Sequence, residues 1–198
     1  MFINCQFDGD LSKWNVEKVT SMHGMFLNAV KFDGDLSLWN TAKVTDMALM
    51  FHKAYLFTGT GLSSWNVGKV KYFNQMFDYS HLMNADLSKW DTSQATNMAY
   101  MFRQAKVFNR NISNWDVSSV TTTDSMFRDT QHFNCDISKV STMLTLPLTH
   151  LSSSLTKHRF LPPPIIQWNI VKLNSMKQMF YGSEKFNQNG WEVLLYSD

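Results

Sequence analysis

"FDGDLSLWNTAKVTDMALMFHKA", residues 32–54, is one unit of a repeat that fills most of this 198-residue chain. Met-Phe pairs recur at 1–2, 25–26, 50–51, 76–77, 101–102, 126–127 and 179–180, with steps of 24, 25, 26, 25, 25 and 53 residues. Tryptophan follows the same spacing, at Trp14, Trp39, Trp65, Trp90, Trp115 and Trp168. Such a period predicts stacked units, because one unit cannot bury its apolar face alone.

The spacing inside the unit predicts its local structure. Apolar residues at steps of three and four indicate one face of a short helix, and Thr45 with Asp46 would cap its start. These apolar residues are Val44, Met47, Met50, Phe51 and Ala54. The "DLS" segment at 35–37 suits a short extended piece. The pattern therefore predicts an α/β fold, a right-handed solenoid of short strand–turn–short helix units of about 25 residues.

Three recurring positions carry more specific expectations. The first residues of the Leu-Ser step should form one buried column with neighbours about 5 Å apart; they are Leu11, Leu36, Leu62, Leu87, Ile112 and Ile137. The serine that follows is expected to be a buried hydroxyl bonded to the backbone. The preceding acids favour a turn or capping role over a calcium column, because Gly61 and Asn111 replace two of them; the acids are Asp10, Asp35, Asp86 and Asp136. Asn or Asp after each Trp suits an Asx turn.

The quoted unit resembles the repeat of bacterial surface proteins of the BspA-like group, a divergent class of leucine-rich repeat. The M-F-x-x-A, D-L-S-x-W-N-V and V-T-x-M motifs carry the resemblance over residues 1–139 and 168–187. It implies a leucine-rich-repeat-like solenoid, a cell-surface or extracellular location, and a role in adhesion or protein binding. The resemblance offers no catalytic residues.

One segment interrupts the array. Removing Val140–Gln167 leaves "DISK" followed by "WNIVKLNSMKQMF" and restores the regular spacing of the Met-Phe pairs. The removed segment holds all four prolines and no acidic residue. A Val codon begins with GT and Gln can be CAG, so the segment is interpreted as a translated in-frame intron; a genuine loop insertion is the alternative. The predicted organisation is a repeat array at 1–139, an insertion at 140–167, and a last repeat with a truncated end at 168–198. The chain is expected to be a piece of a longer array.

No candidate for chemistry stands out. The net charge of +2 gives no reason to expect a nucleic-acid partner. Cys5 and Cys135 form no metal-binding or disulfide pattern, and the six histidines share no repeat position, so they are interpreted as exposed filler. No catalytic, cofactor or metal site is predicted, and the protein is not expected to be an enzyme. The sequence holds neither a membrane span nor a signal peptide.

Two hypotheses about the function are consistent with this sequence. The first is a surface or secreted module that binds a protein or a glycan through the residues before each Trp. These are Lys13, Leu38, Ser64, Lys89 and Asn114. The second is a structural spacer or a non-functional fragment. Clustered exposed aromatics or a patch of one charge would favour binding, and a mixed polar face would favour the spacer. The lysines, including Lys18, Lys43, Lys69 and Lys71, are interpreted as an ordinary solvated face.

Overall fold

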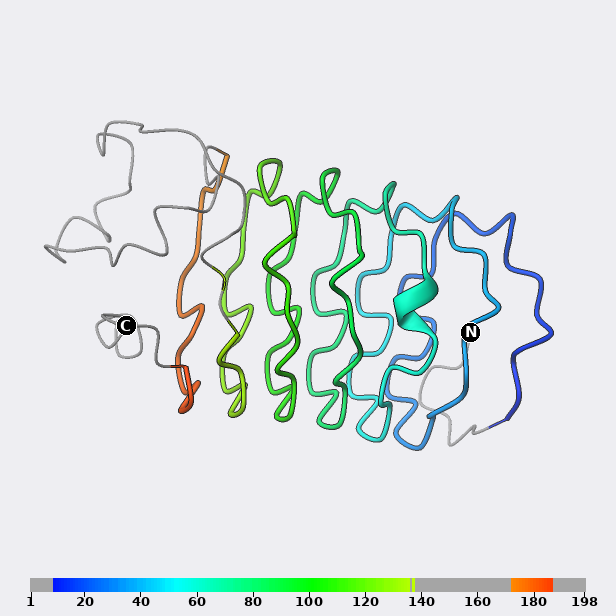
Figure 1. Ribbon diagram of the computed structural model, residues 1–198, viewed down its shortest axis with the longest axis horizontal. Helices are drawn as coiled ribbons and strands as arrows, with labels where there is room; N and C mark the ends of the chain where they lie inside the picture. The colour runs from blue at the N-terminus through cyan, green and yellow to red at the C-terminus, as the bar shows by residue number, and fades with distance from the viewer. Residues whose placement is uncertain (1–8, 136, 138–171, 187–198) are drawn as a thin grey trace, which may run out of the picture.

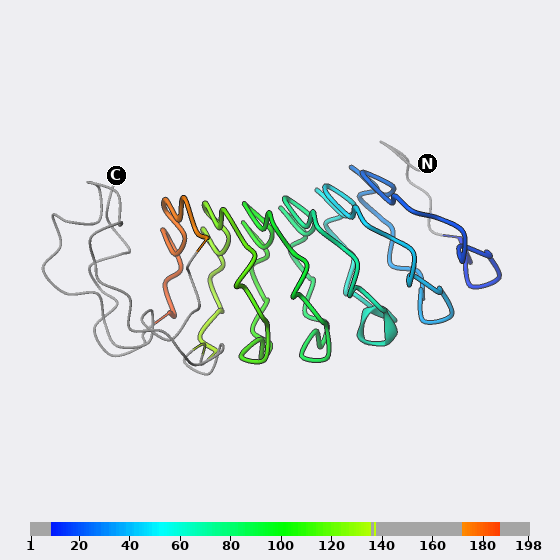
Figure 2. The same ribbon diagram turned by 90° about the horizontal axis from the view of Figure 1, so that it is seen from above.

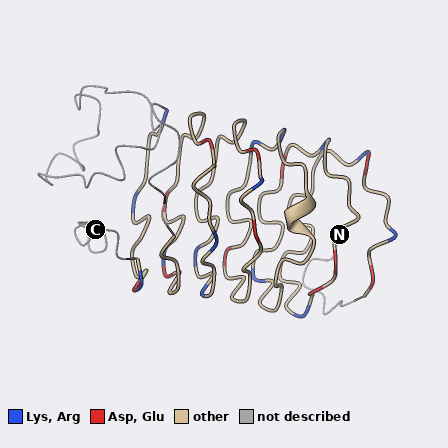
Figure 3. Cartoon of the chain, viewed as in Figure 1, with Lys and Arg blue, Asp and Glu red and all other residues tan. Residues whose placement is uncertain are grey.

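The repeats form a row of stacked coils. A computed structural model describes residues 9–135, 137 and 172–186, and two views show one coil after another along a single axis (Figures 1 and 2). Charged positions of both signs are spread along the coils (Figure 3). Isolated parallel β-bridges join one position per coil, linking Ser21 to Asp46, Asp46 to Tyr72, Tyr72 to Asn97, and Asn97 to Thr122. The stacking register therefore follows the sequence repeat.

The predicted α/β, leucine-rich-repeat-like solenoid of strand–turn–helix units is wrong. The described residues contain no α-helix, and their strand pairing is limited to isolated bridges. The one named element among them is the 3-10 helix η1, Leu62–Ser64 (Figure 1). The coils consist mostly of turns and extended backbone.

A ladder of turns stands where the helix was expected. Within 47–54, the amides of Met50, His52 and Ala54 donate to carbonyls three residues back, at 3.3, 3.1 and 3.0 Å. The alternate amides donate instead to the next coil. These bonds join Met47 to Tyr72, Leu49 to Asn74, Phe51 to Met76, and Lys53 to Asp78. Every second amide is thus used between coils, whereas an α-helix would use all of them within itself. We call these segments the turn ladder; they span 21–29, 46–54, 72–80, 97–105, 122–130 and 175–183.

Left-handed residues separate this geometry from a helix. Leu49 and Lys53 have φ of 60° and 58°, a region that costs a non-glycine residue about 1–2 kcal/mol. The same two positions are left-handed in every other described ladder, at Gly24 and Asn28, Gln75 and Tyr79, Tyr100 and Gln104, Ser125 and Asp129, and Gln178 and Gly182. The hydrogen bonds between coils offset this cost.

The predicted burial of the Leu-Ser column is confirmed, since its members are at most 2% exposed. Beside it, phenylalanines of the Met-Phe pairs stack from coil to coil with ring centroids 5.3–5.7 Å apart. They are Phe26, Phe51, Phe77, Phe102, Phe127 and Phe180. The predicted inward face from Val44 to Ala54 is also fully buried, although turns rather than a helix present it.

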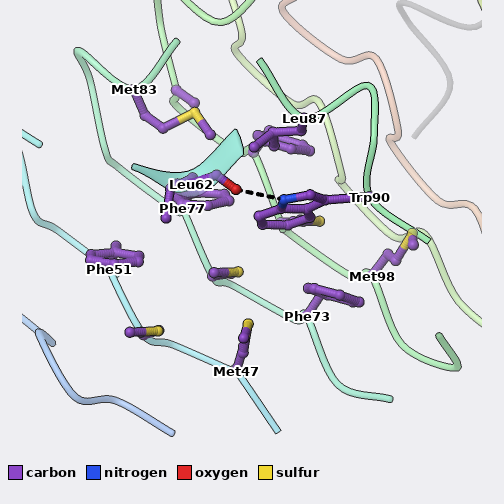
Figure 4. Packing of buried hydrophobic residues seen from close by; sticks show 14 of the residues in the cluster. Met47, Phe51, Leu62, Phe73, Phe77, Met83, Leu87, Trp90 and Met98 are labelled. Carbon is purple, nitrogen blue, oxygen red and sulfur yellow. Dashed lines mark hydrogen bonds between the residues drawn. The ribbon is translucent and has the colours of Figure 1, made fainter. Parts of the chain in front are cut away.

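Trp39, Trp65, Trp90 and Trp115 each join their coil to the preceding one through an indole hydrogen bond. The indole Nε1–H of Trp90 donates to the carbonyl oxygen of Leu62 at 2.9 Å (Figure 4). Trp39, Trp65 and Trp115 donate in the same way to the preceding coil, at 3.0, 3.1 and 3.0 Å. Each of these carbonyls also accepts the amide three residues on in its own coil, at 3.0–3.2 Å, so the indole adds a second bond that joins neighbouring coils.

The stack continues in register on the far side of the interrupting segment. Thr122 pairs with Ser175 across that interruption, and Phe127 N–H donates to the Met179 carbonyl at 2.9 Å. Residues 172–186 thus stack directly on the coil that begins near Thr122, in the register that removal of the segment predicts. Val140–Gln167 and Trp168 lie outside the described residues, so the intron and loop interpretations both stay predictions.

Candidate binding surface

The predicted binding residues do form one row. Each lies in the turn before a Trp, one per coil, and these turns, η1 among them, follow one edge of the stack (Figure 2). All five are exposed: Lys13, Leu38, Ser64, Lys89 and Asn114. Leu38 is 74% exposed, while the Ser64 hydroxyl donates to the Ser37 and Gly61 carbonyls at 3.0 and 2.8 Å. The row mixes apolar, polar and basic side chains, which is the mixed face expected of a spacer.

The turn role of the acids before the Leu-Ser step is confirmed. Asp86 Oδ1 accepts the Ser88 amide at 3.0 Å, and hydrogen bonds from Ser88 hold the pKa of Asp86 below its ordinary value of 3.8. Asp10 and Asp35 accept equivalent bonds at 2.8 Å. The predicted burial of the serine after Leu or Ile is wrong at Ser37 and Ser63, which are exposed, whereas Ser113 is buried. Asp136 lies outside the described residues.

The predicted Asx turns after Trp are also confirmed. The side-chain oxygens accept an amide two residues on, at 2.8–3.2 Å. The accepting residues are Asn15, Asn40, Asn66, Asp91 and Asp116. These polar side chains therefore serve the backbone of the coil.

A buried ion pair lies on the turn ladder. Asp78 has no exposed surface, and Arg103, one coil further along, donates to both its carboxylate oxygens at 2.8 and 2.7 Å. These hydrogen bonds raise the pKa of the Arg103 guanidinium. From the other side, His52 Nδ1 lies 3.1 Å from Asp78 Oδ2, without an aligned hydrogen bond. Three successive coils are thus joined through one carboxylate.

Two tyrosines enclose the arginine of this pair. The Arg103 guanidinium carbon lies 5.2 Å from the Tyr79 ring centroid and 4.8 Å from that of Tyr100. Lys53 Nζ lies 6.0 Å from the Tyr79 ring. Both separations of Arg103 fall within the range of cation–π attraction. The Tyr79 and Tyr100 rings therefore lie against the guanidinium of the ion pair.

An aromatic and aliphatic patch adjoins this cluster, and we call it the aromatic corner: Tyr55, Leu56, Tyr79, His81 and Leu82. The Tyr55 and His81 rings stack at 5.0 Å, and Tyr79 lies 6.3 Å from His81. Leu56 and Leu82 are 47% and 44% exposed. Partial burial, and then the charge of Lys106, lower the pKa of His81, so His81 is neutral at pH 7.

The sequence interpretation missed this corner. The six histidines were expected to be exposed filler, but the His52 side chain is 13% exposed and His81 is half-buried. Tyr55 and His81 hold the same place in consecutive units. The step from Phe51 to Phe77 is 26 residues, and Tyr55 and His81 each stand four residues after one of these phenylalanines. A fixed period of 25 residues would therefore miss this equivalence.

Other kinds of site find no support in the described part of the chain. No three His, Cys, Asp or Glu residues there lie close enough to hold a metal ion. Cys135 is a free thiol, and its partial burial raises its pKa. None of the helices described is long and apolar enough to cross a membrane.

Comparison with known proteins gives a family but no described activity. No curated protein and no solved structure matches the chain. One family matches three times, over residues 1–60, 57–145 and 145–194. These matches together span nearly the whole sequence, in keeping with its repeats. The chain therefore belongs to the repeat family described as "Mycoplasma protein of unknown function, DUF285".

Proposed function

We propose that this chain is a non-enzymatic repeat module, at the cell surface or outside the cell, that binds a protein partner through the aromatic corner. The observation that carries the proposal is the exposure of Leu56 and Leu82 beside the stacked Tyr55 and His81. Tyrosine and arginine are enriched where proteins bind proteins. The resemblance to BspA-like surface repeats supports the location.

The scaffold beneath the corner favours recognition over a passive spacer. Tyr79 is held by Arg103, which is itself fixed by two hydrogen bonds to buried Asp78. Side chains that are ordered before binding lose less conformational entropy on complex formation. A spacer needs no preordered, partly apolar surface such as the aromatic corner. The mixed row of residues before each Trp is the kind of surface expected of a spacer.

The chemistry of the corner favours a protein over a glycan. Leu56 and Leu82 offer no hydrogen-bond donor or acceptor on their side chains. Exposed aliphatic carbon of this kind gains most from contact with an apolar protein surface. A protein partner is therefore the expected ligand of this corner.

The test compares a double variant and a single variant with the wild-type chain in pull-downs from a cell-surface protein extract. Leu56→Ser/Leu82→Ser removes the apolar part of the corner. Leu38→Ser is the control, because Leu38 is still more exposed and lies in the row before Trp. We expect at least one protein to be retained by the wild-type chain and the control but lost by about tenfold or more with the corner variant.

Two results would contradict the proposal. One is a set of retained proteins that is the same for all three chains, which would favour the spacer. The other is a corner-dependent glycan bound on an array in place of any protein. Equal thermal unfolding midpoints for the three chains would show that lost binding does not reflect lost folding.

A further inference from the structure

A second surface lies in the turns that follow each Trp. Hydrogen bonds of 2.9, 2.9 and 2.8 Å close turns at 16–19, 41–44 and 67–70. The third residue of each turn is a lysine: Lys18, Lys43 and Lys69, all exposed. These turns belong to consecutive coils, and the Thr41 hydroxyl in one turn donates to the Asn66 carbonyl at the start of the next at 2.9 Å. The turns line the upper edge of the stack, where Figure 3 shows basic positions on the first coils with acidic positions beside them, Glu17 next to Lys18 among them.

The fold thus gathers lysines that looked scattered along the sequence. The same turn position holds Gln94, Ser119 and Lys172 in the later coils, so none of the described coils places an acid there. Like charges directly opposite one another on neighbouring strands are destabilising. The row of three lysines therefore does not serve the stability of the fold.

An open pocket lies at the end of this row. It has a volume of about 510 Å³ and is open to solvent. Its lining residues come from three coils and include two lysines, two hydroxyl residues, one amide and one carboxylate, and no aromatic residue lines it. The lining residues are Thr45, Gly68, Lys69, Lys71, Asp91, Ser93 and Gln94.

Gly68 and Asp91 affect the space and the charge of this pocket. A Cβ atom at Gly68 would lie 3.1 Å from Asp91 Oδ2, so a side chain at Gly68 would crowd the carboxylate that borders the pocket. Asp91 Oδ1 accepts the Ser93 amide at 3.0 Å, and the hydrogen bonds from Ser93 lower the pKa of Asp91. Asp91 is therefore charged at pH 7, and the two lysines outweigh it.

We propose that the lysine row and this pocket bind a linear polysaccharide that carries sulfate or carboxylate groups. Anionic groups along such a chain would pair with Lys18, Lys43 and Lys69 in turn and remove their mutual repulsion. The hydroxyl and amide groups of the pocket suit sugar hydroxyls. Single-stranded nucleic acid fits less well, because its binding sites stack bases on aromatic side chains and the pocket has none.

This site is separate from the aromatic corner. The corner residues belong to the turn ladder and the turn that follows it, whereas the lysines follow the Trp in each unit. The two proposals therefore succeed or fail independently.

The test measures heparin binding by titration calorimetry at low salt. Lys43→Gln/Lys69→Gln removes two charges from the row. Lys13→Gln/Lys89→Gln removes the same charge from exposed positions in the turns before Trp. We expect the row variant to lose affinity by about tenfold or more and the control by less than about twofold, with wild-type affinity falling as salt is added.

Three outcomes would overturn the proposal. They are no heparin binding by the wild-type chain, an equal loss in the row variant and the control, and tighter binding of single-stranded DNA than of heparin. The first would show that the row does not bind a polysaccharide that carries sulfate and carboxylate groups, the second would show a non-specific charge effect, and the third would assign the row to nucleic acid. Circular dichroism of all three chains would confirm that the substitutions leave the fold intact.

Discussion

At the scale of single residues, the repeat is maintained by groups that satisfy the backbone of a neighbouring coil. Trp90 is 3% exposed, and its indole supplies the hydrogen bond to the Leu62 carbonyl. Phenylalanine would fill most of the same space without this donor. This explains why the position is Trp in unit after unit rather than any large apolar residue.

Trp90→Phe is therefore expected to lower the free energy of unfolding by about 0.5–1.5 kcal/mol, because it removes the bond between coils and leaves the Leu62 carbonyl with the Trp65 amide as its donor. Urea denaturation followed by circular dichroism measures the change. Tyr72→Phe, at a side chain 46% exposed, serves as the control and should stay within about 0.5 kcal/mol. Equal effects of the two substitutions would show that the indole bond does not stabilise the coil.

The buried carboxylate of Asp78 gives a second residue-scale prediction. Arg103→Met should cost about 3–5 kcal/mol, because it leaves the carboxylate buried and without its cation. Adding Asp78→Asn to this variant should recover most of the loss, since the buried charge is then gone. Urea denaturation of the single and double variants measures both effects. A double variant no more stable than Arg103→Met would contradict the role assigned to the pair.

At the scale of the element, the turn ladder explains why the sequence looked helical. Apolar residues at steps of three and four face the core in an α-helix and also in the turn ladder. Val44, Met47 and Phe51, which a helix would bury, are buried here as well. The two structures differ in the sign of the backbone angle φ, which is positive at Leu49 and Lys53 and would be negative in an α-helix. Side-chain periodicity carries no information about that sign. Neither position holds glycine in most units, which removes the usual sequence signal for left-handed backbone.

Gln75→Gly separates the turn ladder from a helix. Gln75 has φ of 58°, so glycine should leave the free energy of unfolding unchanged or raise it by up to about 1 kcal/mol. In a helix interior the same change would lower it by about 1 kcal/mol. Chemical denaturation of the variant and of the wild-type chain measures the difference, and a clear loss would support the helix.

At the scale of the whole molecule, the repeat period predicted what is stacked and buried. The Leu11-to-Ile137 column and the coil register required only the period, because each unit must cover its neighbour. The basic row could also have been predicted, since Lys18, Lys43 and Lys69 each stand four residues after a Trp. The shared place of Tyr55 and His81 in consecutive units could also have been found, but their exposure and ring contact could not, because these depend on how the ladder turns direct side chains outward. The predicted row before Trp is exposed, yet exposure alone does not make it a binding surface.

The interrupting segment gives a prediction at this scale. Because Thr122 pairs with Ser175, deletion of Val140–Gln167 should leave one cooperative unfolding transition with an equal or higher urea midpoint. The cost of closing a loop grows with its length, though slowly. A lower midpoint or loss of the transition would show that the segment contributes to the fold. Sequencing the mature messenger RNA would decide between an intron and a genuine insertion.

The stacked coils with their turn ladders are tested most directly by nuclear Overhauser effects in the isotopically labelled chain. We expect ring contacts between Phe51 and Phe77 and between Phe77 and Phe102, which belong to neighbouring units, with no run of helical contacts over 45–54. Consecutive helical contacts across 45–54, without the contacts between phenylalanines of neighbouring units, would contradict this structure.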